Sequence, residues 1–163
     1  MKRLVILISL CLCFSGCRNR GTINLPEYDY TVKVIGITDG DTFKGLTADK
    51  QQISFRIYGI DAPEKKQAFS NRSKQYLSDL IFGKEVYIKV QKKSDRWNRP
   101  VVWAFTPNGK DVSAEMIKAG MAWHFKRYSK DSKYAELENN ARRKKTGLWA
   151  DKDPVAPWVF RKK

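Results

Sequence analysis

The sequence predicts an α+β domain in which five strands form a barrel and three helices pack beside it. Alternating apolar and polar residues, typical of strands, occur in two groups, at 30–60 and 85–105. A helical pattern separates the two groups, and two more helical patterns follow the second group. The chain has 163 residues, of which 42% are hydrophobic, which is enough for one compact domain with a core. A generic α+β sandwich is the alternative.

Three strands are expected in the first part of the domain, at residues 30–37, 42–46 and 52–60. The Asp39-Gly40 pair between the first two strands is a turn signal typical of a hairpin. In the third strand Phe55 and Ile57 lie on the same face, because side chains alternate along a strand. Arg56 is therefore expected to point away from these two apolar residues.

A helix and two more strands are expected next. After Pro63 apolar residues recur at helical spacing, until Gly83 marks the end of the helix. Strands are then expected at 85–90 and 100–105, with the charged loop 91–99 between them.

Two helices are expected in the last third of the chain. Asp111 is a residue type that caps a helix, and this helix should continue through Ala119 and stop at Gly120. The last helix should run from about Asp131 to Lys145. Three strands, a helix, two strands and two helices is an order that fits a five-stranded barrel of the oligonucleotide/oligosaccharide-binding (OB) type. Because such barrels serve many functions, the fold alone does not identify the activity.

The charge balance of the chain is strongly basic. Lys and Arg number 32 against 17 Asp and Glu, which gives a formal net charge of +15 and a pI near 9.8. Such a charge favours a polyanionic partner, either nucleic acid or an anionic membrane surface. Charge alone does not choose between these partners, and a well-solvated surface is the third possibility.

The chain begins with a predicted lipoprotein-type signal peptide, residues 1–17, cleaved before Cys17. Two basic residues precede an apolar run at 4–14, which is shorter than the roughly 20 residues that span a bilayer. The run ends in "FSGC", which is similar to the bacterial lipoprotein cleavage box, although Phe14 stands where leucine is usual. Ordinary secretory cleavage nearby is the alternative.

This leader predicts an exported domain that is anchored to a membrane by lipid on Cys17. Residues 18–29 are expected to form a polar tether and residues 30–163 the folded domain. All three cysteines lie at or before Cys17, so the exported domain is expected to fold without disulfides. The anchored protein would face the periplasm or the cell surface, and it would be secreted if the lipid site is not used.

Carboxylates gather in one part of this basic chain. Asp39 and Asp41 lie in "DGDT", and Asp61 and Glu64 lie in "DAPE", with Arg56 between the two motifs. Hydrolysis of a phosphodiester requires charge to be neutralised as the transition state forms, and carboxylates that hold a divalent cation meet this need. Taken singly, the same residues can shape a hairpin, favour the start of a helix or form a surface ion pair.

Together with the later "DRWNR" loop, these motifs resemble those of the staphylococcal-nuclease-like, or thermonuclease, family. The resemblance covers roughly residues 30–149 by element order. It implies that Asp41, Asp61 and the backbone carbonyl of Ala62 hold a metal ion. Ca²⁺ accepts such a mixed set of oxygen ligands, whereas Zn²⁺ prefers His and Cys.

The resemblance also implies roles for the remaining site residues. Glu64 would act as the general base or orient the attacking water. Arg56 and Arg99 would bind phosphate oxygens, because planar guanidinium groups suit phosphate. Asp39 would either contact the metal ligands without binding the ion itself or only shape the turn. His124, the single histidine, lies between two aromatic residues and is expected to be structural.

The "DRWNR" loop departs from the family pattern, because Trp97-Asn98 stands where Tyr-Gly is usual. Asn98 can adopt the left-handed backbone that a glycine favours, so Arg99 is expected to keep its place. Trp97 can stack on a base. Arg96, Trp97 and Tyr128 are the residues expected to contact nucleic acid.

The sequence therefore predicts a monomeric, calcium-dependent nuclease that acts on DNA and RNA, with products that by resemblance end in 3′-phosphates. A non-catalytic nucleic-acid-binding barrel is the main alternative, and the presence of every expected site residue argues against it. A surface adaptor that contacts anionic lipid is a further alternative.

Overall fold

The computed structural model describes residues 25–162. The predicted signal peptide, the lipid site at Cys17 and residues 18–24 of the predicted tether lie outside the described residues. The rest of the tether, residues 25–29, forms no helix or strand. In the described part of the chain, no helix is both long and apolar enough to cross a membrane.

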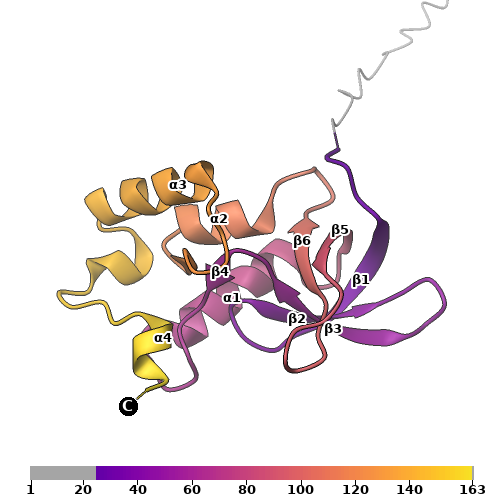
Figure 1. Cartoon of the computed structure of the whole chain (residues 1–163), viewed down its shortest axis with the longest axis horizontal. Coiled ribbons are helices and arrows are strands. Elements are labelled where there is room, and N and C mark those ends of the chain that lie inside the picture. Colours follow the sequence, from indigo (N-terminus) through magenta and orange to yellow (C-terminus); the bar gives the residue numbers. More distant parts are fainter. Residues whose placement is uncertain (1–24, 163) are drawn as a thin grey trace, which may run out of the picture.

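Five strands form the closed barrel that the sequence predicts (Figure 1). They are β1 (Tyr30–Ile37), β2 (Thr42–Leu46), β3 (Gln52–Ile57), β5 (Glu85–Lys92) and β6 (Val101–Phe105). Around the barrel the order is β1-β2-β3-β6-β5, and β5 pairs with β1 to close it. The β3–β6 pair is parallel, and the other barrel pairs are antiparallel.

The inward side chains of these strands fill the barrel. The buried apolar residues are Val32, Val34, Phe43, Phe55, Ile57, Val86, Ile88, Val102 and Ala104. Gly45 lies among them, and a Cβ atom at this position would come within 2.7 Å of Val32 and 2.9 Å of Phe55. Phe55 and Ile57 are buried whereas Arg56 is only partly buried, so Arg56 points away from them as expected.

Within the described residues there are four α-helices, one more than the sequence predicts. They are α1 (Ser70–Ile81), α2 (Val112–Lys118), α3 (Ser132–Arg143) and α4 (Pro157–Phe160), and a 3₁₀ helix, η1 (Gly147–Ala150), lies between the last two. Asp111 caps α2 through its side chain, as predicted, and Asp131, where the last helix is expected to begin, caps α3 in the same way. The additional helix α4 has only four residues, which is too short to give a helical pattern in the sequence.

The predicted strand 52–60 is interrupted, and this break positions the candidate site. After β3 the chain turns at Gly59, which has a φ of 77° and packs against Tyr134. The chain then forms a short second sheet of β4 (Ile60–Asp61) and β7 (Trp123–His124). Ile60 and Asp61 are both buried, and Asp61 pairs with Trp123 of β7.

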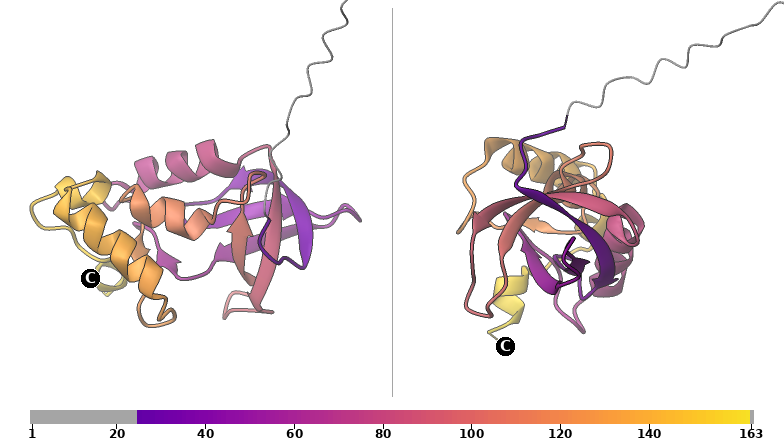
Figure 2. Two further views of the ribbon diagram at one scale, coloured as in Figure 1. Left: turned by 90° about the horizontal axis from the view of Figure 1, so that it is seen from above. Right: turned by 90° about the vertical axis from the view of Figure 1, so that its right-hand side faces the viewer.

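A second apolar cluster holds the helical part together. Its buried residues are Trp123, Ala141, Leu148, Trp149 and Ala156, with Phe69 and Trp158 packed against them. Figure 2 shows this part at one end of the molecule and the barrel at the other. His124 is buried beside it and its Nε2 lies 3.1 Å from Ser129 Oγ, in keeping with a structural role.

Candidate active site

The hairpin turn between β1 and β2 packs closely against the chain that follows β4. A Cβ atom on Gly40 would lie 1.8 Å from Ser73 Oγ and 2.8 Å from Ala62 Cβ, so only a glycine fits. The close approach lets the backbone N–H of Ala62 donate a hydrogen bond to Asp41 Oδ2 at 2.7 Å. The motifs "DGDT" and "DAPE" are therefore neighbours in space.

Arg56 joins the two motifs. Its Nη1 forms an ion pair with Asp41 Oδ1, and its Nη2 donates to Asp61 Oδ1 at 3.1 Å and to the carbonyl of Ile60 at 3.0 Å. The Arg56 side chain is 16% exposed, and those of Asp41 and Asp61 are 9% and 1% exposed. The guanidinium thus bridges two carboxylates that are largely removed from water.

Burial governs the electrostatics of this cluster. Loss of water lowers the pKa of the Arg56 guanidinium, while Asp61 and Asp39 act to raise it. Burial also raises the pKa of Asp39, and Arg56 opposes this effect. Asp39 Oδ1 accepts a hydrogen bond from the backbone N–H of Asp41 at 3.0 Å. Asp39 therefore shapes the turn and adds negative charge beside Arg56, and its support of the metal ligands stays a prediction.

Glu64 lies at the open side of the cluster. It is partly buried, and its backbone N–H donates to the Gln67 side chain at 3.0 Å. Its Oε1 forms an ion pair with Nη1 of Arg161, a residue that follows α4 near the end of the described chain. Arg161 also binds Asp61, with Nη2 2.6 Å from Oδ2 and Nη1 3.2 Å from Oδ1.

Sequence reasoning missed Arg161. The residue stands in the basic sequence "RKK", and nothing local distinguishes it from the lysine that follows. Its partner Asp61 is 100 residues earlier in the chain. The hydrogen bonds to Asp61, together with the one to Glu64, raise the pKa of the Arg161 guanidinium.

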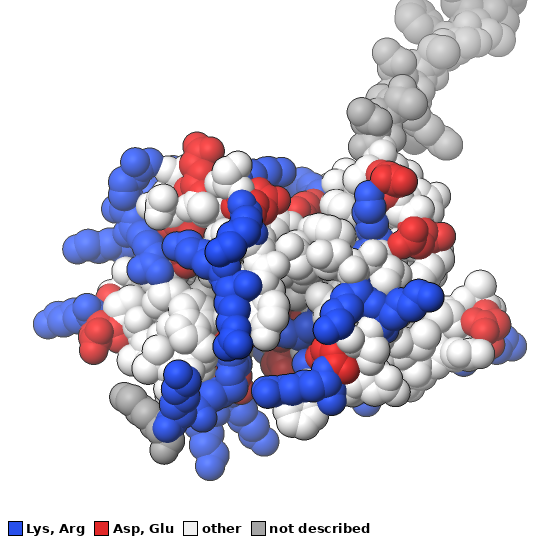
Figure 3. Space-filling view, in the orientation of Figure 1, with Lys and Arg blue, Asp and Glu red and all other residues white. Residues whose placement is uncertain are grey.

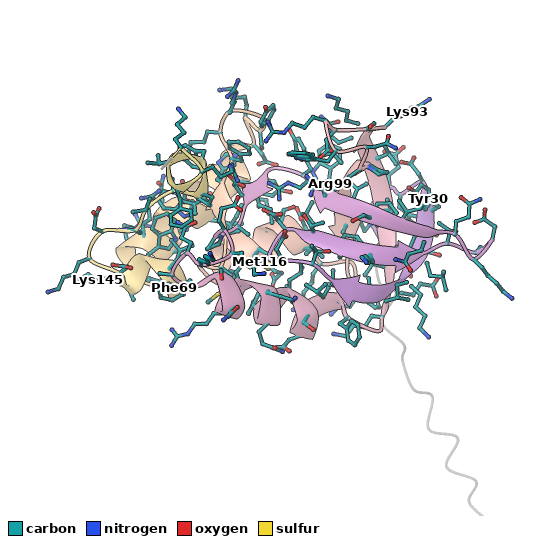
Figure 4. All side chains as sticks on the ribbon, turned by 90° about the horizontal axis from the view of Figure 1, so that it is seen from below. Tyr30, Phe69, Lys93, Arg99, Met116 and Lys145 are labelled. Carbon is teal, nitrogen blue, oxygen red and sulfur yellow. The ribbon has the colours of Figure 1, made fainter. Side chains whose placement is uncertain are left out.

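The predicted phosphate ligand Arg99 also reaches the cluster. Its Nε and Nη2 donate to Asp95 Oδ2 at 3.0 and 2.7 Å, and its Nη1 donates to Thr42 Oγ1 at 3.2 Å. Thr42 Oγ1 in turn donates to Asp41 Oδ1 at 3.1 Å. Asn98 has a φ of 58°, so it takes the left-handed backbone as expected. Figure 4 shows Arg99 at the barrel, away from the helical end that carries Phe69 and Lys145.

The residues predicted to contact nucleic acid lie on the surface. Trp97 is 64% exposed and Tyr128 is 63% exposed. The Arg96 guanidinium lies 4.8 Å from the Trp97 ring centre, and that of Arg127 lies 5.7 Å from the Tyr128 ring centre. Each aromatic ring is thus paired with a cation, which suits bases and phosphates together.

The wider surface is basic. Figure 3 shows Lys and Arg spread over one face of the molecule, with fewer Asp and Glu among them. This distribution agrees with the excess of 32 Lys and Arg over 17 Asp and Glu in the sequence.

The donor chemistry of the cluster fits a hard cation. Asp41, Asp61 and Glu64 present carboxylate oxygens, and their partners in the cluster are guanidinium groups, a backbone N–H and a hydroxyl. Such oxygens are the ligands that Ca²⁺ accepts. Among the described residues no group of three or more His, Cys, Asp or Glu side chains surrounds a common metal position. Arg56 and Arg161 lie among the carboxylates instead. The role of the Ala62 carbonyl as a metal ligand stays a prediction.

The sequence is similar to a known family and to several proteins named as nucleases. Residues 54–151 match the family described as "Staphylococcal nuclease homologue". A Haemophilus influenzae protein named "Uncharacterized endonuclease" is 38% identical, over 99% of this chain and 87% of its own length. A "Micrococcal nuclease" of Shigella flexneri is 36% identical, over 86% of each chain. An "Uncharacterized endonuclease" of Escherichia coli O157:H7 is 37% identical, over 79% of this chain and 83% of its own length.

The matched segment contains the site residues from Arg56 to Arg99, and the similarity to whole relatives extends over most of the chain. The family resemblance drawn from the motifs is thus confirmed. The chain belongs to the staphylococcal nuclease family of nucleases.

Proposed function

We propose that this nuclease depends on calcium, hydrolyses the phosphodiester bonds of DNA and RNA, and leaves 3′-phosphate ends. The observation that carries the proposal is the Arg56 bridge between Asp41 and Asp61, with Glu64 in the same cluster. This arrangement brings three carboxylates and a guanidinium together, and these groups would serve as cation ligands, base and phosphate-binding group. The 3′-phosphate ends are what the family likeness implies.

Asp41 and Asp61, with the Ala62 carbonyl, would hold Ca²⁺ in this proposal. The ion would act as a Lewis acid that offsets the negative charge developing on the phosphate oxygens. The donor set supports calcium over zinc, because the cluster offers oxygen atoms and its chain segments contain no His or Cys.

Protein side chains would perform the remaining steps. Glu64 would take a proton from the attacking water through a carboxylate oxygen, and its 36% exposure leaves it open to solvent. Arg56 and Arg99 would bind the phosphate oxygens with charged donors held in place by Asp41 and Asp95. Fixed donors of this kind stabilise the transition state without having to reorganise during the reaction.

The surface supports binding without sequence preference. Lys and Arg attract the phosphate backbone of any nucleic acid, and Trp97 and Tyr128 offer faces on which bases can stack. DNA and RNA both have a phosphate backbone and bases that can stack, so these surface features favour action on both.

The activity is tested by incubating the protein with single-stranded DNA in Ca²⁺, in Mg²⁺ or in chelator, followed by analysis of the fragment ends. We expect cleavage in Ca²⁺ that chelator abolishes, because the carboxylates cannot neutralise the phosphate by themselves. Cleavage that persists in chelator would contradict the calcium site. Salt-sensitive binding with no cleavage in any condition would favour the non-catalytic barrel.

We also propose that the protein is exported and anchored by lipid on Cys17. The "FSGC" sequence after the apolar run 4–14 supports this. Cys17→Ser is expected to release the protein from membranes or to block its maturation, because the modified thiol is lost. Fatty-acid labelling of cells measures this directly, with Cys13→Ser as the matched control. A wild-type protein that takes up no label would exclude the anchor.

A further inference from the structure

Arg161 occupies carboxylate oxygens that the proposed cation site requires. Its guanidinium contacts both oxygens of Asp61 and Oε1 of Glu64. Arg56 Nη2 donates to the same Asp61 Oδ1, at 3.1 Å. Two guanidinium groups therefore meet at a single carboxylate that is 1% exposed.

The position of Arg161 is fixed by the segment that carries it. Three residues earlier, the Trp158 ring stacks on Phe125 with centroids 5.4 Å apart, and it contacts Trp123 edge-on at 5.5 Å. Ala156 is buried, and the carbonyl of Val155 accepts a hydrogen bond from the Gln67 side chain. The contact between Arg161 and Asp61 is therefore supported by packing along the whole segment, and Figure 1 shows α4 lying beside the segment that leads into α1.

The charges explain why an arginine is held there. Asp61 is buried, and a buried carboxylate is costly unless it is paired. Arg56 is shared with Asp41, so it neutralises only part of the charge of the two acids. Arg161 supplies the remaining cation. It is also the partner that can leave at least cost, because its side chain is 37% exposed whereas that of Arg56 is 16% exposed.

We propose that Arg161 is an internal counter-ion that competes with the divalent cation for Asp61 and thereby sets the cation affinity of the site. The inference rests on the proposed calcium site. Cation binding at Asp61 requires the guanidinium to give up at least one carboxylate oxygen, so its two-pronged contact with Asp61 is lost when the cation binds. Arg161 lies in the C-terminal segment, outside the residues 54–151 that match the family.

Calcium titration of the full-length protein by calorimetry, without nucleic acid, tests this competition. Arg161→Gln is expected to bind Ca²⁺ about twofold to fivefold more tightly, which is the scale of losing one partly exposed ion pair. Arg161→Lys keeps the charge but loses the two-pronged contact, so its affinity should lie between those of the wild type and Arg161→Gln. Lys162→Gln removes the neighbouring charge and should leave the affinity close to that of the wild type.

Different titration results would contradict different parts of the proposal. If the wild type binds Ca²⁺ and Arg161→Gln binds it equally or more weakly, the competition is excluded while the calcium site stands. If Lys162→Gln tightens binding as much as Arg161→Gln, the effect is general charge and the specific role of Arg161 is excluded. If the wild type shows neither calcium binding nor calcium-dependent cleavage, the proposed function fails and this inference fails with it. A melting curve of each variant without calcium identifies any loss of folding, and Arg161→Lys then carries the test.

Discussion

Glu64→Gln is expected to slow single-turnover cleavage by about 10²-fold to 10⁴-fold, the usual contribution of a general base. The amide has almost the same shape as the carboxylate but cannot accept a proton from water at neutral pH. Calcium binding should persist, because Asp41 and Asp61 keep their oxygens. The measurement is the rate of cleavage of a labelled single strand, with enzyme in excess and Ca²⁺ saturating.

This substitution also removes the ion pair between Glu64 and Arg161. Arg161→Gln breaks the same pair but keeps the carboxylate, so it is the matched control. At saturating Ca²⁺ it should retain far more of the cleavage rate than Glu64→Gln. Equal losses in the two variants would assign the effect to the ion pair and would remove Glu64 from the role of base.

The barrel was predictable because its residues follow local rules. The strand at 30–37 and the capped helix starts at Asp111 and Asp131 coincide with the structure. Each depends on neighbouring residues, through alternation in the strand and through the hydrogen bonds of a cap. The left-handed backbone at Asn98 was predictable for the same reason, because few residue types tolerate it.

The break after β3 was not predictable from pattern, because apolar residues continue through Ile60. Its cause is tertiary: the chain turns at Gly59, where the ring of Tyr134 lies against the backbone. The short sheet of β4 and β7 joins distant parts of the chain, and its Ile60–His124 pair is 64 residues apart in sequence. No local signal in the sequence reports such a pairing.

Some residues of the candidate site were predictable from the sequence and one was not. Residues in short motifs were found from the sequence, and the structure brings Asp41, Arg56, Asp61 and Glu64 together, with Arg99 linked through Thr42. Arg161 was not found, because its position depends on the packing of Trp158 rather than on any motif. The catalytic and metal-binding roles of these residues stay predictions until variants are measured.

Arg56 is the residue on which the cluster depends most, because it contacts both Asp41 and Asp61. Its Nη1 forms an ion pair with Asp41, and its Nη2 donates to Asp61 and to the carbonyl of Ile60. In the proposed mechanism the same planar group would also donate to a phosphate oxygen.

Arg56→Lys is therefore expected to lower the single-turnover cleavage rate by about 10²-fold to 10³-fold, the loss seen when one donor to the transition state is removed. A lysine keeps the charge, which should hold the fold together, but one ammonium cannot contact two carboxylates and a phosphate with the geometry of a planar fork.

Arg143→Lys on the exposed side of α3 is the matched control, and its cleavage rate should equal that of the wild type. Nucleic-acid binding should change little in either variant, because each keeps its charge and most of the attraction to phosphates is electrostatic. An Arg56→Lys variant that cleaves at the wild-type rate would show that the guanidinium only neutralises Asp41 and Asp61, and the phosphate would then have to be held by Arg99 alone.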